Sequence, residues 1–361
     1  MKKSIITLAL VLVVALLTGC AGTPVVYYSN CTCPTGTHTG NVPQDTTPVQ
    51  TQPVIPEGAV KTGVAIVASA GESKNAGDAD GEVKYDVSVV AVTVSDDGVI
   101  TDCIIDSIGT PVLFDVSGTI VSDVTAAIAT KNELGEAYGM KAWGGSAYEW
   151  NEQAAALAAY AVGKTVEELR TGAVDETGHA ADADLATTAT IYLGGYVSAI
   201  EQAVANAQHL GAQAGDELKL AILPSASSSK SADAENAGNA QLDVDAAAVT
   251  MNDGVITSCQ IDSLQAKVAF DATGTITADL SQPFATKNEL GERYGMVAWG
   301  GAIAEWNAQA ASFAAYITGK TPAEVSGIAV NEGTKPADAD LASSVTIAIG
   351  GFQALIAKAC G

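Results

Sequence analysis

The chain has 361 residues, enough for two domains of ordinary size, and a formal net charge of −24 at pH 7. A polyanion of this size repels nucleic acids and anionic lipid head groups, so we exclude nucleic acid as a partner. Only three histidines occur and none is paired with another at helical spacing, which argues against a histidine-rich metal site.

The first 19 residues have the pattern of a lipoprotein signal peptide. Two lysines precede an apolar run that is too short to span a bilayer comfortably. The run closes with Leu17-Thr18-Gly19-Cys20, which resembles a bacterial lipobox. The resemblance implies that Cys20 is lipidated and becomes the mature N-terminus, anchored in the cell membrane and facing the extracellular side. The alternative is an ordinary signal peptide with a chance cysteine.

Residues 20–60 are rich in threonine and proline, carry few charges and show no periodicity. Such a segment cannot bury enough apolar surface to fold, so it is predicted to be a tether. A flexible chain of about 40 residues spans roughly 35 Å. Cys31 and Cys33 lie in this tether and could pair with each other or stay free; without histidine partners they make a poor metal site.

The rest of the chain is one domain written twice, which we divide into residues 61–212 and 213–361. TKNELGEAYGMKAWGG, starting at Thr130, returns as TKNELGERYGMVAWGG, starting at Thr286, and the two copies stay in step to the end of the chain. The repeat is several times longer than a solenoid unit, so it indicates a duplicated domain.

Each copy is predicted to begin with an antiparallel β-meander and to continue with helices. Alternating and β-branched residues indicate strands, and Asp97-Gly98 and Asp253-Gly254 indicate tight hairpin turns. The expected strands are 63–69, 82–94 and 99–108 in the first copy and 216–224, 241–251 and 255–264 in the second, each set followed by a short extended piece at 112–118 or 267–274. The fold class is therefore α+β: a tandem duplicated domain, each copy an antiparallel β-meander with helices packed on one side.

The helical part of each copy has clear start and stop signals. Alanine-rich amphipathic segments at 146–163 and 302–319 end at Gly163 and Gly319. Capping boxes follow at Thr165 with Glu168 and, with proline in the first helical position, at Thr321 with Glu324. A last helix begins at each Gly-Gly, over 194–208 and 350–360.

Some familiar motifs are excluded. The Gly-Lys-Thr triplets at 163–165 and 319–321 lack the earlier glycine of a phosphate-binding P-loop, because Ala158 and Ala314 stand there within a helix. Cys103 and Cys259 occupy matching strand positions and are predicted to be small buried residues.

The phrase at 182–195, DADLATTATIYLGG, returns at 338–351 as DADLASSVTIAIGG. It resembles the attachment motif of the FMN-binding domain family, in which the last threonine of D-x-x-S-G-A-T carries FMN through a phosphoester made by a separate FAD-dependent flavin transferase. The whole chain is similar to two-domain flavinylated lipoproteins of extracellular electron transfer. The same residues also fit a β-strand and turn kept only for packing.

The resemblance implies two covalent FMN groups, on Thr190 and Thr346. The other implied site residues are the motif acids Asp184 and Asp340, and Thr187, Thr188, Ala189, Ser343, Ser344 and Val345. Thr188 and Ser344 depart from the family, which has glycine there for close backbone approach or positive φ. The Gly-Gly helix start offers N–H groups and a positive dipole end to a phosphate.

Large residues of the repeated segments 130–145 and 286–301, named the TKNEL block from here on, could flank the flavin ring or belong to the core. They are Tyr138, Met140 and Trp143, repeated as Tyr294, Met296 and Trp299.

The expected function is a redox carrier that takes electrons from a membrane quinol-oxidising partner and passes them to external acceptors such as ferric iron or soluble flavin. No nucleophile–base pair or metal cluster indicates an enzyme with a dedicated substrate. The alternative is a non-redox surface lipoprotein that binds a peptide, glycan or wall polymer, or acts as a spacer.

Overall fold

The structure is a computed structural model that describes residues 58–361. The predicted signal peptide, the lipidation site at Cys20 and the tether with Cys31 and Cys33 lie outside the described residues. In the part of the chain that is described, no helix has both the length and the apolar character that a membrane crossing requires.

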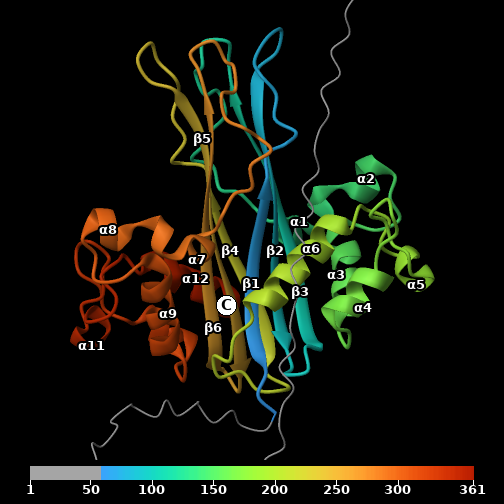
Figure 1. The fold of residues 1–361 in the computed structure, drawn as a ribbon, viewed down its shortest axis with the longest axis vertical. Helices are drawn as coiled ribbons and strands as arrows, with labels where there is room; N and C mark the ends of the chain where they lie inside the picture. The colour runs from blue at the N-terminus through green and yellow to red at the C-terminus, as the bar shows by residue number, and fades with distance from the viewer. Residues whose placement is uncertain (1–57) are drawn as a thin grey trace, which may run out of the picture. The chain divides into compact units, whose positions relative to one another are not determined.

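Each copy begins with the predicted antiparallel meander, and the α+β class is confirmed (Figure 1). The strands are β1 (Lys61–Ser69), β2 (Gly81–Val94) and β3 (Ile100–Phe114) in the first repeat, and β4 (Glu217–Ser225), β5 (Gly238–Asn252) and β6 (Val255–Phe270) in the second. Gly98 and Gly254 have φ of +79° in the two hairpin turns, a conformation that suits glycine. The separate extended pieces predicted after the third strand were wrong in part, because 112–114 continues β3 and 267–270 continues β6.

The helices follow in the same order in both repeats. In the first repeat they are α1 (Lys131–Leu134), the 3₁₀ turn η1 (Gly135–Tyr138), α2 (Met140–Gly144), α3 (Trp150–Ala161), α4 (Val166–Gly172), α5 (Ala183–Ala186) and α6 (Gly194–Asn206). In the second they are α7 (Lys287–Leu290), η2 (Gly291–Tyr294), α8 (Met296–Gly300), α9 (Trp306–Ile317), α10 (Pro322–Ser326), α11 (Ala339–Ala342) and α12 (Gly350–Cys360).

Local signals account for the ends of the longer helices. Gly163 and Gly319 directly follow the C-caps of α3 and α9 with φ of +82° and +85°, as predicted. Both predicted capping boxes form, at the starts of α4 and α10. The short helices of the TKNEL block were not predicted; Thr130 and Thr286 begin them with two further capping boxes.

The two repeats share a central apolar layer. The sheets lie face to face, with each repeat's helices on the outer side of its own sheet (Figure 1). Alternate residues of β2 therefore face opposite layers: Val87 and Val89 pack against the other sheet, whereas Val90 and Val92 pack against the helices. Because both faces are covered, the strands are apolar along most of their length.

The shared layer contains specific contacts between the repeats. The rings of Phe114 and Phe270 stack with centroids 4.2 Å apart. The buried Tyr85 hydroxyl donates to the carbonyl oxygen of Ala240 at 2.8 Å. Desolvation and stacking of these large rings tie the two copies into one folding unit.

A second set of contacts repeats with the internal symmetry. Gln202 of α6 donates to Glu289 of α7 at 3.0 Å, and Lys358 of α12 pairs with Glu133 of α1 at 2.6 Å. Each acceptor is the glutamate of a TKNEL capping box. The last helix of each repeat is therefore linked to the first helix of the other.

We expect that neither repeat is stable alone. A chain of residues 58–212 would expose the face of β1–β3 that carries Tyr85, Val87 and Phe114, which are fully buried in the whole molecule. An apolar face of this kind drives association or unfolding. Size-exclusion chromatography and thermal denaturation of the separate repeats should show aggregation or a large loss of stability. Monomeric repeats that melt at the temperature of the intact chain would contradict the shared core.

Candidate functional site

A buried aspartate on the third strand of each sheet links the TKNEL block to that sheet by hydrogen bonds. Asp106 on β3 accepts hydrogen bonds from the amides of Ser107 (2.7 Å) and Asn132 (3.0 Å). Asp262 makes the same two contacts in the second repeat, at 2.7 and 3.1 Å. Burial raises the pKa of the Asp262 carboxyl to about 6 and raises that of Asp106 as well. The sequence interpretation missed both residues, although their identity in matching positions was a signal.

In the TKNEL block, Lys131 and its counterpart Lys287 each lie against two aromatic rings. Lys131 is 8% exposed, and its Nζ lies 5.1 Å from the ring centroid of Trp150 and 5.2 Å from that of Tyr138. Lys287 lies in the same way near Trp306 and Tyr294, at 4.8 and 5.4 Å. Within residues 58–361, Lys131 forms no ion pair. Asp86 lines one cavity together with Lys131, and a buried cation without a direct ion pair attracts an anionic ligand.

The repeated segments EWNEQ (149–153) and EWNAQ (305–309) hold the short helices α2 and α8 in place. Glu149, 3% exposed, accepts from the amides of Met140 (2.8 Å) and Lys141 (3.1 Å) and so holds the start of α2. Glu305 holds the start of α8 in the same manner. A carboxylate at a helix start satisfies amides that have no partner within the helix.

Gln153, which is fully buried, holds the predicted acceptor threonine. Its Oε1 accepts from the amide and the hydroxyl of Thr190, at 2.8 and 3.2 Å, and from the amide of Ile191 at 3.1 Å. Its Nε2 donates to Ser146 Oγ and to the carbonyl oxygen of Tyr148. Gln309 binds the amide and hydroxyl of Thr346 at the same distances, 2.8 and 3.2 Å. The sequence interpretation missed both glutamines, although each lies four residues after a repeated glutamate.

The two threonines lie in loops. Thr190 is exposed and Thr346 half-buried, each between a short helix (α5 or α11) and the last helix of its repeat. The alternative interpretation of this phrase as a packing strand was therefore wrong. The amides at 190 and 191 bond to the Gln153 side chain, so they are not available for a sheet ladder.

The motif acids and the residues at 187 and 343 lie apart from the hydroxyls of Thr190 and Thr346. Asp182, not Asp184, caps α5 by accepting from the amides of residues 184 and 185. The exposed Asp184 lines a separate hollow with Tyr160 and Lys164, and its carbonyl accepts from the Thr187 hydroxyl at 2.6 Å. Asp340 and Ser343 repeat this last contact at 2.7 Å. The motif acids and the acceptor hydroxyls are thus not in mutual contact.

The backbone at residues 188–189 and 344–345 accounts for the absence of the glycine that the family motif has. Ala189 and Val345 are buried, at 1% and 0% exposure. Neither Thr188 nor Ser344 has a positive φ. The local backbone therefore does not require glycine at these two positions.

A cavity of about 540 Å³ lies beside Thr190. The neighbouring Ile191 lines it together with Lys131, Tyr138, Trp150, Tyr192 and Tyr196. Met140 also lines it, whereas Trp143 and its counterpart Trp299 are 90% and 89% exposed. The volume is in the range of sites for cofactor-sized ligands. Tyr138 and Met140, two of the three residues predicted as ring neighbours, thus line this cavity. The other aromatic residues of its lining were not predicted from the sequence.

The start of α6 faces the same cavity through Gly195. This helix has no side-chain N-cap, and neither has α12. The N–H groups of Leu193 and Gly194 donate to the carbonyl of Gly178, so the helix offers the cavity the positive end of its dipole and not a set of free N–H groups.

Tyr192 reaches the cavity because of a glycine across from it. A Cβ on Gly178, whose φ is +78°, would lie 2.2 Å from the Tyr192 ring. In the second repeat the tyrosine is replaced by Ala348 and the glycine by Thr334. We expect Gly178→Ala to destabilise the chain by about 1–3 kcal/mol and to displace the ring, because the backbone conformation and the ring both oppose a Cβ.

Thr334→Gly is the matched control and should be neutral or stabilising, since Thr334 has a φ of +56° and no ring above it. Urea denaturation of the two variants measures the difference. Equal effects would show that Tyr192 is not packed on Gly178.

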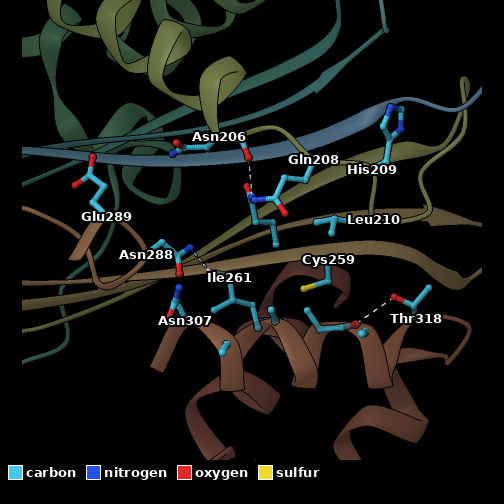
Figure 2. Close-up of a pocket in the computed structure, with 15 residues that line it drawn as sticks. Asn206, Gln208, His209, Leu210, Cys259, Ile261, Asn288, Glu289, Asn307 and Thr318 are labelled. Atoms are coloured by element: carbon cyan, nitrogen blue, oxygen red, sulfur yellow. Dashed lines mark hydrogen bonds between the residues drawn. The ribbon is translucent and has the colours of Figure 1, made fainter. Parts of the chain in front are cut away.

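Figure 2 shows a second cavity, of about 610 Å³, between α9 and the segment that follows α6. Several of its amides already have partners: Asn288 donates to the carbonyl of Ile261, and Gln260 to that of Asn206, both at 2.9 Å. None of the motif residues lines it. The buried Cys259 does, and Cys103 is buried as well, both as predicted.

The cavity lined by Ile191, the residue after Thr190, combines a buried cation and ring faces with one carboxylate, that of Asp86. This set suits an anionic group joined to a planar ring system. No family model, no curated protein and no solved structure matches the chain.

Proposed function

We propose that the protein is a membrane-anchored extracellular electron carrier with two covalent FMN groups, one each on Thr190 and Thr346. The observation that carries the proposal is the exposed Thr190, whose hydroxyl is held by the buried Gln153 next to Ile191, a residue that lines a cavity with Lys131 and several aromatic rings. The bound flavin supplies reversible acceptance and release of electrons.

The residues present fit this group. A threonine can form a phosphoester only through an accessible hydroxyl, and the loop position of Thr190 allows an external transferase to reach it. Phosphoester formation replaces the hydroxyl hydrogen with the FMN phosphoryl group, while the FAD bound by the transferase loses AMP. Lys131 and the positive end of the α6 dipole offset the negative charge of the phosphate and of the ring.

Other residues of the chain position and shield the flavin. Trp150, Tyr192 and Tyr196 offer ring faces, and Trp150 is itself oriented by an Nε1–H bond to the Tyr196 hydroxyl at 3.0 Å. A covalent attachment prevents loss of the cofactor by dilution outside the cell. Electrons would come from a membrane quinol-oxidising partner and leave to ferric iron or soluble flavin.

The protein purified from its native host should be yellow, and its intact mass should exceed the mass of the lipidated polypeptide by two FMN units, each less one water. Absorbance in the flavin region and mass spectrometry of tryptic peptides test this directly. A colourless, unmodified chain would overturn the proposal and favour a non-redox surface module.

A further inference from the structure

The two sites differ in charge at a matching strand position. On β2, Ser88 pairs in register with Ser107, and on β5 the matching residue Asp245 pairs with Ser263. Four residues earlier, Lys84 is replaced by Gln241, but its partner Pro111 is replaced by Lys267, so these two changes cancel in charge. The lysine beneath the rings, the nearby tryptophan and the η-turn tyrosine are the same in both.

The additional carboxylate lies at the site itself. Asp245 Oδ2 is 3.8 Å from the position that a Cβ would take on Gly351, in the first turn of α12. Gly195, the counterpart of Gly351, lines the cavity of the first repeat together with Ser88. Asp245 therefore lies next to the helix start and faces the space that Ser88 lines in the other copy.

Apart from Asp245, the charges around the two sites are similar. In the first repeat Lys84 pairs with Glu72 and lies 4.0 Å from Asp86. In the second, Gln241 donates to Asp243 at 2.8 Å, and Lys267 stands opposite Gln241 where the first repeat has Pro111 opposite Lys84. Burial lowers the pKa of Lys287 and raises that of Asp245, while the attraction between the two opposes both shifts. The second site thus has more negative charge around the same lysine.

We propose that Asp245 gives the flavin on Thr346 a lower reduction potential than the flavin on Thr190. The inference rests on the proposed function. Reduction adds negative charge to the flavin ring, which a nearby carboxylate opposes and a nearby lysine favours. The duplication would then supply two flavins of different potential within one chain.

The experiment measures the two potentials separately. Thr346→Val leaves only the flavin of the first repeat and Thr190→Val only that of the second, and spectroelectrochemical titration gives the midpoint potential of each. We expect the second to be lower. In the Thr190→Val chain, Asp245→Ser and Asp245→Asn should both raise it, while Ser88→Asp in the Thr346→Val chain should lower the first.

Asp245→Ser copies the residue that the first repeat already has opposite a serine, so the fold should tolerate it. A second measurement needs no flavin: in the unmodified chain, Asp245→Ser should lower the pKa of Lys287, followed by NMR of its side chain. An unchanged Lys287 pKa, equal or reversed potentials, or an Asp245→Ser variant with an unaltered potential would each overturn the inference. Absence of flavin from the native protein would overturn the proposed function instead, and this inference with it.

Discussion

Replacing Thr190 with valine should remove one FMN from the protein and leave the other in place. Valine has nearly the shape of threonine and lacks only the hydroxyl that would carry the phosphoester. Thr346→Val should remove the second flavin, and the double variant should be colourless but folded. Intact mass and flavin absorbance after production with the flavin transferase give the count.

The fold should survive these changes because, among residues 58–361, each hydroxyl makes a single hydrogen bond of 3.2 Å, to a glutamine that keeps its bond to the amide of the same residue. The loss should cost about 1 kcal/mol, against a domain stability of roughly 5–15 kcal/mol. Thr187→Val and Ser343→Ala are the controls: their hydroxyls bond to the backbone of α5 and α11, and labelling should persist. If both Thr190→Val and Thr346→Val retain two flavins, the attachment site is elsewhere.

Replacing Gln153 with methionine should release the acceptor loop of the first repeat. The side chain keeps its length but loses bonds to two loop amides and the Thr190 hydroxyl, and to the Ser146–Tyr148 turn on the other side. Leaving these groups unpaired should destabilise the chain by about 2–4 kcal/mol. Labelling of Thr190 should fall strongly, because the hydroxyl is no longer held beside the cavity.

Gln309→Met provides an internal control for this prediction, since it should affect Thr346 and spare Thr190. Peptide mapping of the two attachment sites, combined with urea denaturation, separates loss of labelling from loss of folding. Equal labelling of both threonines in the Gln153→Met chain would show that the glutamine supports the fold alone and does not position the acceptor.

The sequence by itself determined the duplication, the fold class, the hairpins and the ends of the longer helices. These features depend on neighbouring residues: Asp-Gly sets a tight turn, Thr165 and Glu168 cap one helix, and Gly163 ends another through a positive φ. It also placed Cys103 correctly in the interior, because the strand pattern around it is apolar on alternate positions.

The tertiary structure decided which residues form the site. β-branched residues around Thr190 favour a strand locally, but the Gln153 side chain, 37 residues away, takes the amides that a sheet would need. Lys131 becomes a buried cation because Trp150 of another helix and Tyr138 of the neighbouring turn lie against it. Likewise, the alternation along β2 did not reveal that a second copy of the domain covers its other face, since burial on both sides depends on residues more than 100 positions away.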